Sequence, residues 1–486
     1  MTMPTTTGFG LWWPLLIPVG ASFLVGVFGL RLQAWARALF TAGTLLSFGL
    51  MPFGAAARAH PLAMWGYALV AVLSLLAVWF SGPYIAAERR SHGWDARRVQ
   101  RYQVFLYLFV ASMMAMAIVP NYLLMWLALE GATFSSTWLV DTAHVRTSTE
   151  AAWKYMVLTE SAGLAGLAGT VLIIHFTGHN VAHWGFHFAQ AGSVWPSGVV
   201  LGVLLAAIGY GTKAGLAPFH TWLPDAHSEA PAPVSALLSS LKLAGSLMIL
   251  ERLLVIAGGA IAHAITSDIL MGLGLVSLLI AAGFVASQQD LKRLWAYSSI
   301  EHIGLIALGF GFGGIALLGA LLHMWTHALN KSLLFYNAGT VRVLYHTSRH
   351  AEGARGILGR TPWTGMLLSV GSLGIVGVPP FAPFWSEWLI LAGGFQNPAD
   401  RPLVWIAMAL LVVIFIGIAL MVPRWLFVAG RVQAEPVSGT RLAEPWSLLW
   451  PSAVLLVMVS VGGLAIPLVA HGWWVNAGQR LGHFGP

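Results

Sequence analysis

Residues 212–227 read TKAGLAPFHTWLPDAH and interrupt an otherwise apolar run near the middle of the chain. Lys213 stands among apolar residues, and Pro218 removes a backbone hydrogen-bond donor, which opens a helix. Residues 377–391, GVPPFAPFWSEWLIL, repeat the pattern, because Ala-Pro-Phe is again followed closely by Trp and a charged residue, Glu387, stands nearby. Paired interrupted helices in the two halves of a membrane protein mark an inverted repeat, and unwound backbone is tolerated there only where it lines a cavity or is covered by protein. The two stretches therefore predict two related helical bundles.

The amino-acid composition places these broken helices in a membrane. Of the 486 residues, 58% are hydrophobic and 9% are charged, whereas a soluble domain carries about 25% charged residues. So few charges cannot cover a water-facing surface, which excludes a soluble globular enzyme and a disordered protein. The chain has no cysteine, which excludes disulfide staples and cysteine-ligated zinc or iron–sulfur sites. We predict an all-α polytopic membrane protein.

Apolar runs set the predicted organisation. A helix that spans the membrane needs about 20 apolar residues. The chain has about 14 apolar runs of this length, which predicts about 14 transmembrane helices. They include two inverted five-helix repeats with broken helices. N-terminal helices are predicted in residues 1–100, the two repeats in 101–256 and 264–430, and a C-terminal helix in 431–486.

Basic residues indicate the orientation in the membrane. The net charge of +8 comes from 25 Lys and Arg against 17 Asp and Glu, and topology explains it better than a nucleic-acid partner does. Of the 25 basic residues, 18 fall in one alternating set of predicted loops, 4 in the other set and 3 inside apolar runs. Because cytoplasmic loops are enriched in Lys and Arg, we expect both termini on the non-cytoplasmic side of the cell inner membrane.

Ionisable residues inside the apolar runs point to function. An ionised group at membrane depth costs several kcal/mol unless it is paired or hydrated. A single such residue could form a structural ion pair, but a series on many helices favours a proton relay, in which each group changes charge at modest cost. The series comprises Glu130, Glu160, Lys213, Lys242, Glu301, His302, His323, His327, Lys331 and Glu387.

Part of this series has helical spacing. His323, His327 and Lys331 follow one another at intervals of four residues. On a helix they share one face, roughly 6 Å apart per step, so a proton could pass between them through interposed water. The alternative is a packing face with satisfied histidines, which the lysine at the end of the stripe disfavours.

Two other polar stretches have weaker indications. Histidines at residues 175, 179, 183 and 187 also repeat every four residues, and two histidines in that register can bind zinc. Glycines interrupt them and no carboxylate lies nearby, which favours a solvated segment at the membrane interface. We therefore predict neither a metal site nor a cofactor. The polar segment 223–235 is either a cytoplasmic loop or a hydrated channel entry.

Four stretches carry a resemblance to a known family. They read KAGLAPFHTWLPDAHSEAPAPVSALLSSLKLAG (213–245), LLMWLALEGATFSSTWLV (123–140), DLKRLWAYSSIEHIG (290–304) and HALNKSLLFYNAG (327–339). They resemble the antiporter-like proton-pumping subunits of respiratory complex I and related hydrogenases, across nearly the whole chain. Within this family, AYSSIEHIG, with Glu301 and His302, looks most like the hydrogenase-4 F component.

The resemblance implies roles for particular residues. Glu130 and Lys213 match the ion pair of the first half channel, and Lys242 matches the lysine of the following helix. The central relay and the terminal group of the second half channel are matched by His327, Lys331 and Glu387. Glu160 matches no role in the family.

The resemblance also implies partners. We expect other membrane subunits and a peripheral redox or uptake module, with energy from electron transfer in the partners, because the sequence resembles no flavin, haem or cluster site. Three alternatives stay open. The chain could serve a multi-component cation/proton antiporter, an inorganic-carbon uptake complex, or a passive structural scaffold in the membrane.

Overall fold

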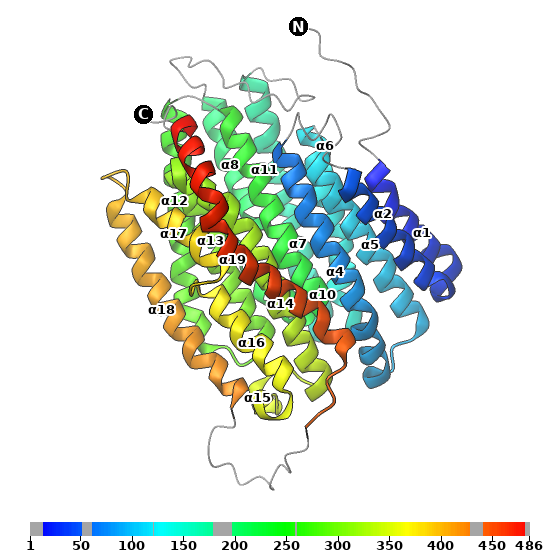
Figure 1. The fold of residues 1–486 in the computed structure, drawn as a ribbon. Helices are drawn as coiled ribbons and strands as arrows, with labels where there is room; N and C mark the ends of the chain where they lie inside the picture. Colours follow the sequence, from blue (N-terminus) through cyan, green and yellow to red (C-terminus); the bar gives the residue numbers. More distant parts are fainter. Residues whose placement is uncertain are drawn as a thin grey trace.

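The computed structural model describes residues 13–50, 61–119, 121–177, 197–257, 260–427 and 441–481. All regular elements in these ranges are helices (Figure 1), and ten helical segments are long and apolar enough to span a bilayer. This confirms an all-α polytopic membrane protein, while the count of 14 spans stays a prediction. The α-helices are α1 (Trp13–Phe28), α2 (Gln33–Leu50), α4 (Pro61–His92), α5 (Ala96–Ile118), α6 (Tyr122–Val140), α7 (Arg146–Thr177), α8 (Ser197–Ala214), α9 (Trp222–Glu229), α10 (Ala232–Leu237), α11 (Leu243–Ala257), α12 (Ala260–Phe284), α13 (Leu291–Phe312), α14 (Gly314–Tyr345), α15 (Ile357–Arg360), α16 (Pro362–Ile375), α17 (Ala382–Gly394), α18 (Arg401–Leu426) and α19 (Trp446–Leu481).

Both predicted helix breaks are present, but they are built differently. The first separates α8 from α9 and contains Gly215, whose φ of +80° suits glycine, together with Pro218. The second separates α16 from α17 and contains Gly377, with a φ of +69°. The Ala-Pro-Phe motif lies inside the first break, whereas in the second it forms the start of α17. Pro383 is tolerated there because the first turn of a helix needs no donor from that residue.

A third irregular stretch joins α10 to α11. Residues Leu238–Lys242 form a π-helical segment that ends at the buried Lys242. Single π-helical turns inside α-helices are rare and often occur at functional sites, since they redirect one side chain relative to the regular helix. The segment from α10 through α11 is buried along its most apolar stretch, so it lies in the centre of the bundle.

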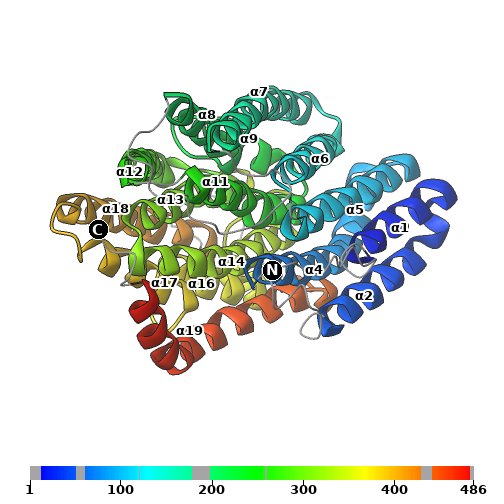
Figure 2. The ribbon, with the colours of Figure 1, turned by 90° about the horizontal axis from the view of Figure 1, so that it is seen from above.

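The helices on either side of the centre pack in the same order. In the first half α5 packs on α6, α6 on α7, and α7 on both α8 and α9, the two sides of the first break. In the second half α12 packs on α13, α13 on α14, and α14 on both α16 and α17, the two sides of the second break. Seen from above, α1 and α2 lie at one side of the bundle, with α12 and α18 at the other (Figure 2). The residue boundaries of the two repeats, and their inverted relation, stay predictions.

Helix α19 crosses the outside of the bundle obliquely, contacting α4, α14, α16 and α17 (Figures 1 and 2). Its Gly463 lies directly against the backbone of the second break, where a Cβ atom would collide with the Pro380 carbonyl oxygen. The Gly463 carbonyl also accepts a hydrogen bond of 2.8 Å from Trp385 Nε1. The second break is thus covered by protein, as unwound backbone at this depth requires.

Several basic loops meet at one end of the bundle, the lower end in Figure 1. Arg342 near the end of α14 donates to Glu88 near the end of α4, with Nε 3.2 Å from Oε1. The backbone N–H of Leu442 donates to the Arg360 carbonyl over 3.0 Å, which joins the segment before α19 to α15. The first contact joins the ends of α4 and α14, and the second joins α15 to the segment before α19.

Candidate functional site

A buried ion pair lies beside the first break. Lys213, in the last turn of α8, is fully buried, and its Nζ lies 2.7 Å from Glu130 Oε2 on α6 and 3.1 Å from Thr133 Oγ1. Gly163 of α7 packs against both charged side chains, because a Cβ there would lie 2.8 Å from Lys213 Cε and 3.0 Å from Glu130 Cδ. Removing one partner of a buried pair strands the other charge and costs about 3–5 kcal/mol. The structure thus brings together the two residues that the resemblance paired.

Lys242, at the end of the π-helical segment, is also fully buried. Its ammonium donates to the hydroxyl of Tyr155 on α7, and it also lies 4.1 Å from the centre of that ring. The same hydroxyl lies 2.6 Å from Ser136 Oγ on α6. Tyr155 is fully buried. The sequence did not predict its role, since one tyrosine in a long apolar helix gives no signal.

Glu160 also belongs to this first cluster. It lies on α7, three residues before Gly163, the glycine that packs against Glu130 and Lys213. Two carboxylates and two lysines therefore share one buried neighbourhood in the first half.

Lys331 occupies the centre of the second half without a direct carboxylate partner among the described residues. Its Nζ donates to the Trp295 carbonyl on α13 over 3.1 Å and lies 5.9 Å from the centre of the Trp295 ring. Glu301 lies on the same helix as Trp295, six residues further along α13. Glu301 Oε2 accepts a hydrogen bond of 3.2 Å from Ser298 Oγ.

Three histidines and Glu387 form a cluster next to the second break. His302 Nδ1 lies 3.0 Å from His323 Nε2 and 3.9 Å from Glu387 Oε1. The rings of His302 and His327 have centres 5.3 Å apart. Gly377 lies against the Glu387 carboxylate. All three histidines are fully buried, so the predicted stripe on α14 does meet α13 and α17.

His227 is a second residue that sequence analysis missed. The segment 223–235 is not a loop, because it forms α9 and the start of α10, and the His227 side chain is fully buried. Its ring stacks on Phe335 of α14 with centres 5.1 Å apart. Helix α9, which carries His227, packs against α7 of the first half and α13 of the second half. The sequence did not predict a buried histidine here, because Asp225, His227 and Glu229 lie close together, a pattern typical of a solvated loop.

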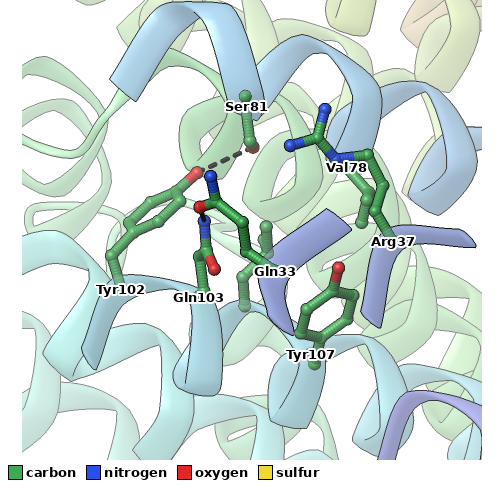
Figure 3. A pocket seen from close by; sticks show the side chains of 9 residues that line it. Gln33, Arg37, Val78, Ser81, Tyr102, Gln103 and Tyr107 are labelled. Carbon is green, nitrogen blue, oxygen red and sulfur yellow. Dashed lines mark hydrogen bonds between the residues drawn. The ribbon is translucent and has the colours of Figure 1, made fainter. Parts of the chain in front are cut away.

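Two other polar regions stand apart from these clusters. The side chain of His175 is exposed at the end of α7, and the remaining three histidines of its series lie outside the described residues. A small polar pocket lies between α2, α4 and α5 (Figure 3), where Ser81 Oγ and Tyr102 Oη are 2.8 Å apart and Gln103 donates to Gln33 over 3.0 Å. No residue of the predicted relay lines that pocket.

Interrupted helices beside buried lysines and carboxylates, in a fully helical bundle with ten candidate spans, define an antiporter-like membrane subunit. The chain belongs to the NADH:quinone oxidoreductase/Mrp antiporter transmembrane family, whose match covers residues 119–427. This confirms the resemblance that the four sequence stretches carry.

Individual relatives agree with this assignment. The chain is 32% identical over 483 residues to a hydrogenase-4 component F homolog of Methylacidiphilum infernorum, which covers 96% of this chain and 98% of the relative. Its fold is similar to a chain of the membrane-bound sulfane sulfur reductase, an archaeal respiratory membrane complex, with a TM-score of 0.81, 22% identity and 97% of both chains covered. It is also similar to a chain of the Mrp complex from Dietzia sp., with a TM-score of 0.73, 16% identity and 96% of both chains covered. The chain is thus an antiporter-like membrane subunit of the hydrogenase-4 and complex I type.

Proposed function

We propose that this chain translocates protons across the cell inner membrane as one subunit of a redox-driven complex. The observation that carries the proposal is the buried Glu130–Lys213 pair, whose atoms lie 2.7 Å apart beside a helix break. A buried pair is weak evidence for stability, because apolar side chains would often serve as well. Its place at the end of a file of further ionisable groups favours transport.

The relay would run through the two clusters in order. Attraction within the Glu130–Lys213 pair stabilises both ionised forms, so separating the two groups destabilises the Lys213 ammonium in a medium of low dielectric. The proton then passes toward Lys242 by way of the Thr133 and Tyr155 hydroxyls. We infer that a neighbouring membrane subunit drives the separation, with energy from a peripheral redox module.

The second half would complete the path. His227, between Lys242 and Lys331, would link the halves, and interposed water would bridge the longer gaps. From Lys331 the proton would pass to the acceptors of the second cluster, which are Glu301, His302, His323, His327 and Glu387.

Helix directions support an inverted relation between the halves. Asp225 of α9 lies 3.5 Å from Lys154 near the start of α7 and 2.7 Å from Arg293 at the start of α13. Helix α6 therefore ends, and α13 begins, at the same end of the bundle. The two helices run in opposite directions, as inverted repeats require. We assign this end, where the basic loops meet, to the cytoplasm, which puts both termini on the other side.

The decisive experiment uses membrane vesicles that contain the assembled complex. An electron donor for the complex should acidify one compartment, as measured with a pH-sensitive dye, and an uncoupler should abolish the signal. Acidification driven by a sodium gradient without electron transfer would overturn the redox assignment in favour of a cation/proton antiporter. Co-purification of a zinc-containing cytoplasmic partner instead of redox subunits would favour inorganic-carbon uptake.

A further inference from the structure

The cluster beside the second break also has the donor set of a metal site. His302 of α13, His323 of α14 and Glu387 of α17 each offer one ligand atom, and these atoms lie within 4.8 Å of one another. In a tetrahedral zinc site with bonds of about 2.0–2.1 Å, ligand atoms are roughly 3.3 Å apart. The separations of 3.0 Å between the two histidine nitrogens and 3.9 Å between His302 Nδ1 and Glu387 Oε1 bracket that value. We propose that His302, His323 and Glu387 bind a divalent transition-metal ion, with Zn²⁺ as the best fit.

Hydrogen bonds around the cluster present the correct nitrogen of His323. Ser386 Oγ donates to the Pro383 carbonyl over 2.8 Å. With its one proton given to that carbonyl, Ser386 Oγ can accept from His323 Nδ1–H, 2.8 Å away, and from the Thr326 hydroxyl, 2.9 Å away. The lone pair of His323 then resides on Nε2, the atom that faces His302. Metal-binding histidines nearly always donate their other N–H in this way.

His302 has a comparable partner on its far side. Its Nε2 lies 3.8 Å from Glu301 Oε2. A small rotation would give a carboxylate–histidine contact, which orients the ring so that Nδ1 faces the metal. With zinc bound, the two charges of the ion would be balanced by the carboxylates of Glu301 and Glu387.

His327 lies beside the three proposed ligands and is a candidate for a fourth. Both ring nitrogens of His327 are buried without a hydrogen-bond partner within the described part of the chain. Its ring centre lies 5.3 Å from that of His302 and 6.2 Å from that of His323. Buried polar groups in folded proteins are nearly always satisfied, so His327 is suited to supply the fourth ligand directly or through water. The imidazole donors favour zinc, copper or nickel over magnesium or calcium.

A bound ion would have a consequence for transport, which rests on the proposed function. The nitrogen lone pairs that ligate the metal are those that would accept protons from Lys331. An ion in the site would therefore block the second half of the path and leave the Glu130–Lys213 pair unaffected.

Metal binding is tested separately from transport. The purified complex is loaded with Zn²⁺, desalted and assayed for metal by mass spectrometry, and X-ray absorption then reports the ligands. We expect one tightly held zinc per copy of this chain, with nitrogen and oxygen ligands only. Glu387→Gln, His323→Ala and the milder Ser386→Ala should each weaken binding by at least tenfold, while His175→Ala, on the exposed end of α7, should leave it unchanged. Size-exclusion profiles confirm that the variants assemble.

Two results would overturn the site. One is a wild-type complex that retains no zinc, and the other is zinc retained equally by the Glu387→Gln and Ser386→Ala variants. In vesicles, added Zn²⁺ should inhibit proton translocation and a chelator should restore it. Zinc that binds at the site without slowing translocation would support the metal site and contradict the proposed proton path through it.

Discussion

The two halves of the bundle hold their ionisable groups in opposite ways. In the first half an ammonium and a carboxylate are in direct contact, with Lys213 Nζ 2.7 Å from Glu130 Oε2. In the second half Lys331 donates to a backbone carbonyl, and beside it the facing nitrogens of His302 and His323 lie 3.0 Å apart. The first arrangement depends on attraction between full charges, while the second places imidazole rings side by side.

This difference suggests a division of labour. A contact ion pair responds strongly when its partners move apart, because the Coulomb energy in a poorly screened site changes steeply with distance. Neutral histidines respond weakly to an external charge, but each ring can accept a proton on one nitrogen and release one from the other. The first half is therefore suited to sensing a neighbouring subunit, and the second half to conducting.

The largest effect is expected from removing one member of the ion pair. Lys213→Ala or Glu130→Ala should reduce proton translocation to background in vesicles, because the remaining charge is stranded. Each should also lower the stability of the complex by about 3–5 kcal/mol. The double variant Glu130→Gln/Lys213→Met should regain most of that stability without regaining translocation, measured as thermal unfolding in detergent and dye response.

Its matched control is an ion pair at the surface. Glu150 and Lys154 on α7 are also 2.7 Å apart, but both are about half exposed, and water screens such surface pairs so that they add little stability. Glu150→Gln should translocate normally. Full translocation by both buried single variants would remove the pair from the mechanism.

A smaller effect is expected from a substitution that displaces the Glu130 and Lys213 side chains without replacing either of them. In Gly163→Ala the new methyl group would lie 2.8 Å from Lys213 Cε, so the two charged side chains must shift. We expect translocation to fall several-fold, with a stability loss of about 1–3 kcal/mol from overpacking. Gly272→Ala on α12 is the control, since its Cβ would meet nothing within 4 Å. Equal rates in the two variants would mean that the pair tolerates displacement.

Sequence patterns located the breaks and most of the buried charges, and the resemblance paired Glu130 with Lys213, but neither gave the contacts of the second half. Proline and lysine inside apolar runs are visible in one dimension, and so is the i, i+4 stripe of His323 and His327. The contact between His302, His323 and Glu387 joins three helices, and no spacing in the sequence encodes which helix faces which. The role of Tyr155 could not be predicted for the same reason, because it depends on a contact with Lys242 from another helix.

A weaker effect still is expected at the hydroxyl between the two lysines. Tyr155→Phe keeps the ring beneath the Lys242 ammonium but removes the group to which it donates, together with the contact to Ser136. Translocation should slow by a few-fold, with the complex intact, if this hydroxyl passes protons in the first half. Tyr102→Phe removes another buried hydroxyl, 2.8 Å from Ser81 Oγ, and should leave the rate unchanged. Identical rates would show that water alone connects Lys213 to Lys242.

The smallest effect is expected from the N-caps of α6 and α13, the helices that carry Glu130 and Glu301. Asn121 caps α6 by accepting from the N–H groups of Leu123 and Leu124, at 2.9 and 3.2 Å. Asp290 caps α13 in the same way, and its Oδ2 also accepts from Ser348 Oγ over 2.6 Å. Losing an N-cap costs about 0.5–2 kcal/mol.

We therefore expect Asn121→Ala to lower the thermal stability of the complex slightly and Asp290→Ala to lower it more, because the aspartate also ties α13 to the loop after α14. Neither side chain belongs to the proposed path, so translocation per assembled complex should be preserved in both. A larger loss for Asn121→Ala would mean that the start of α6 is held mainly by its cap, and that the first half depends on local hydrogen bonds where the second depends on contacts between loops.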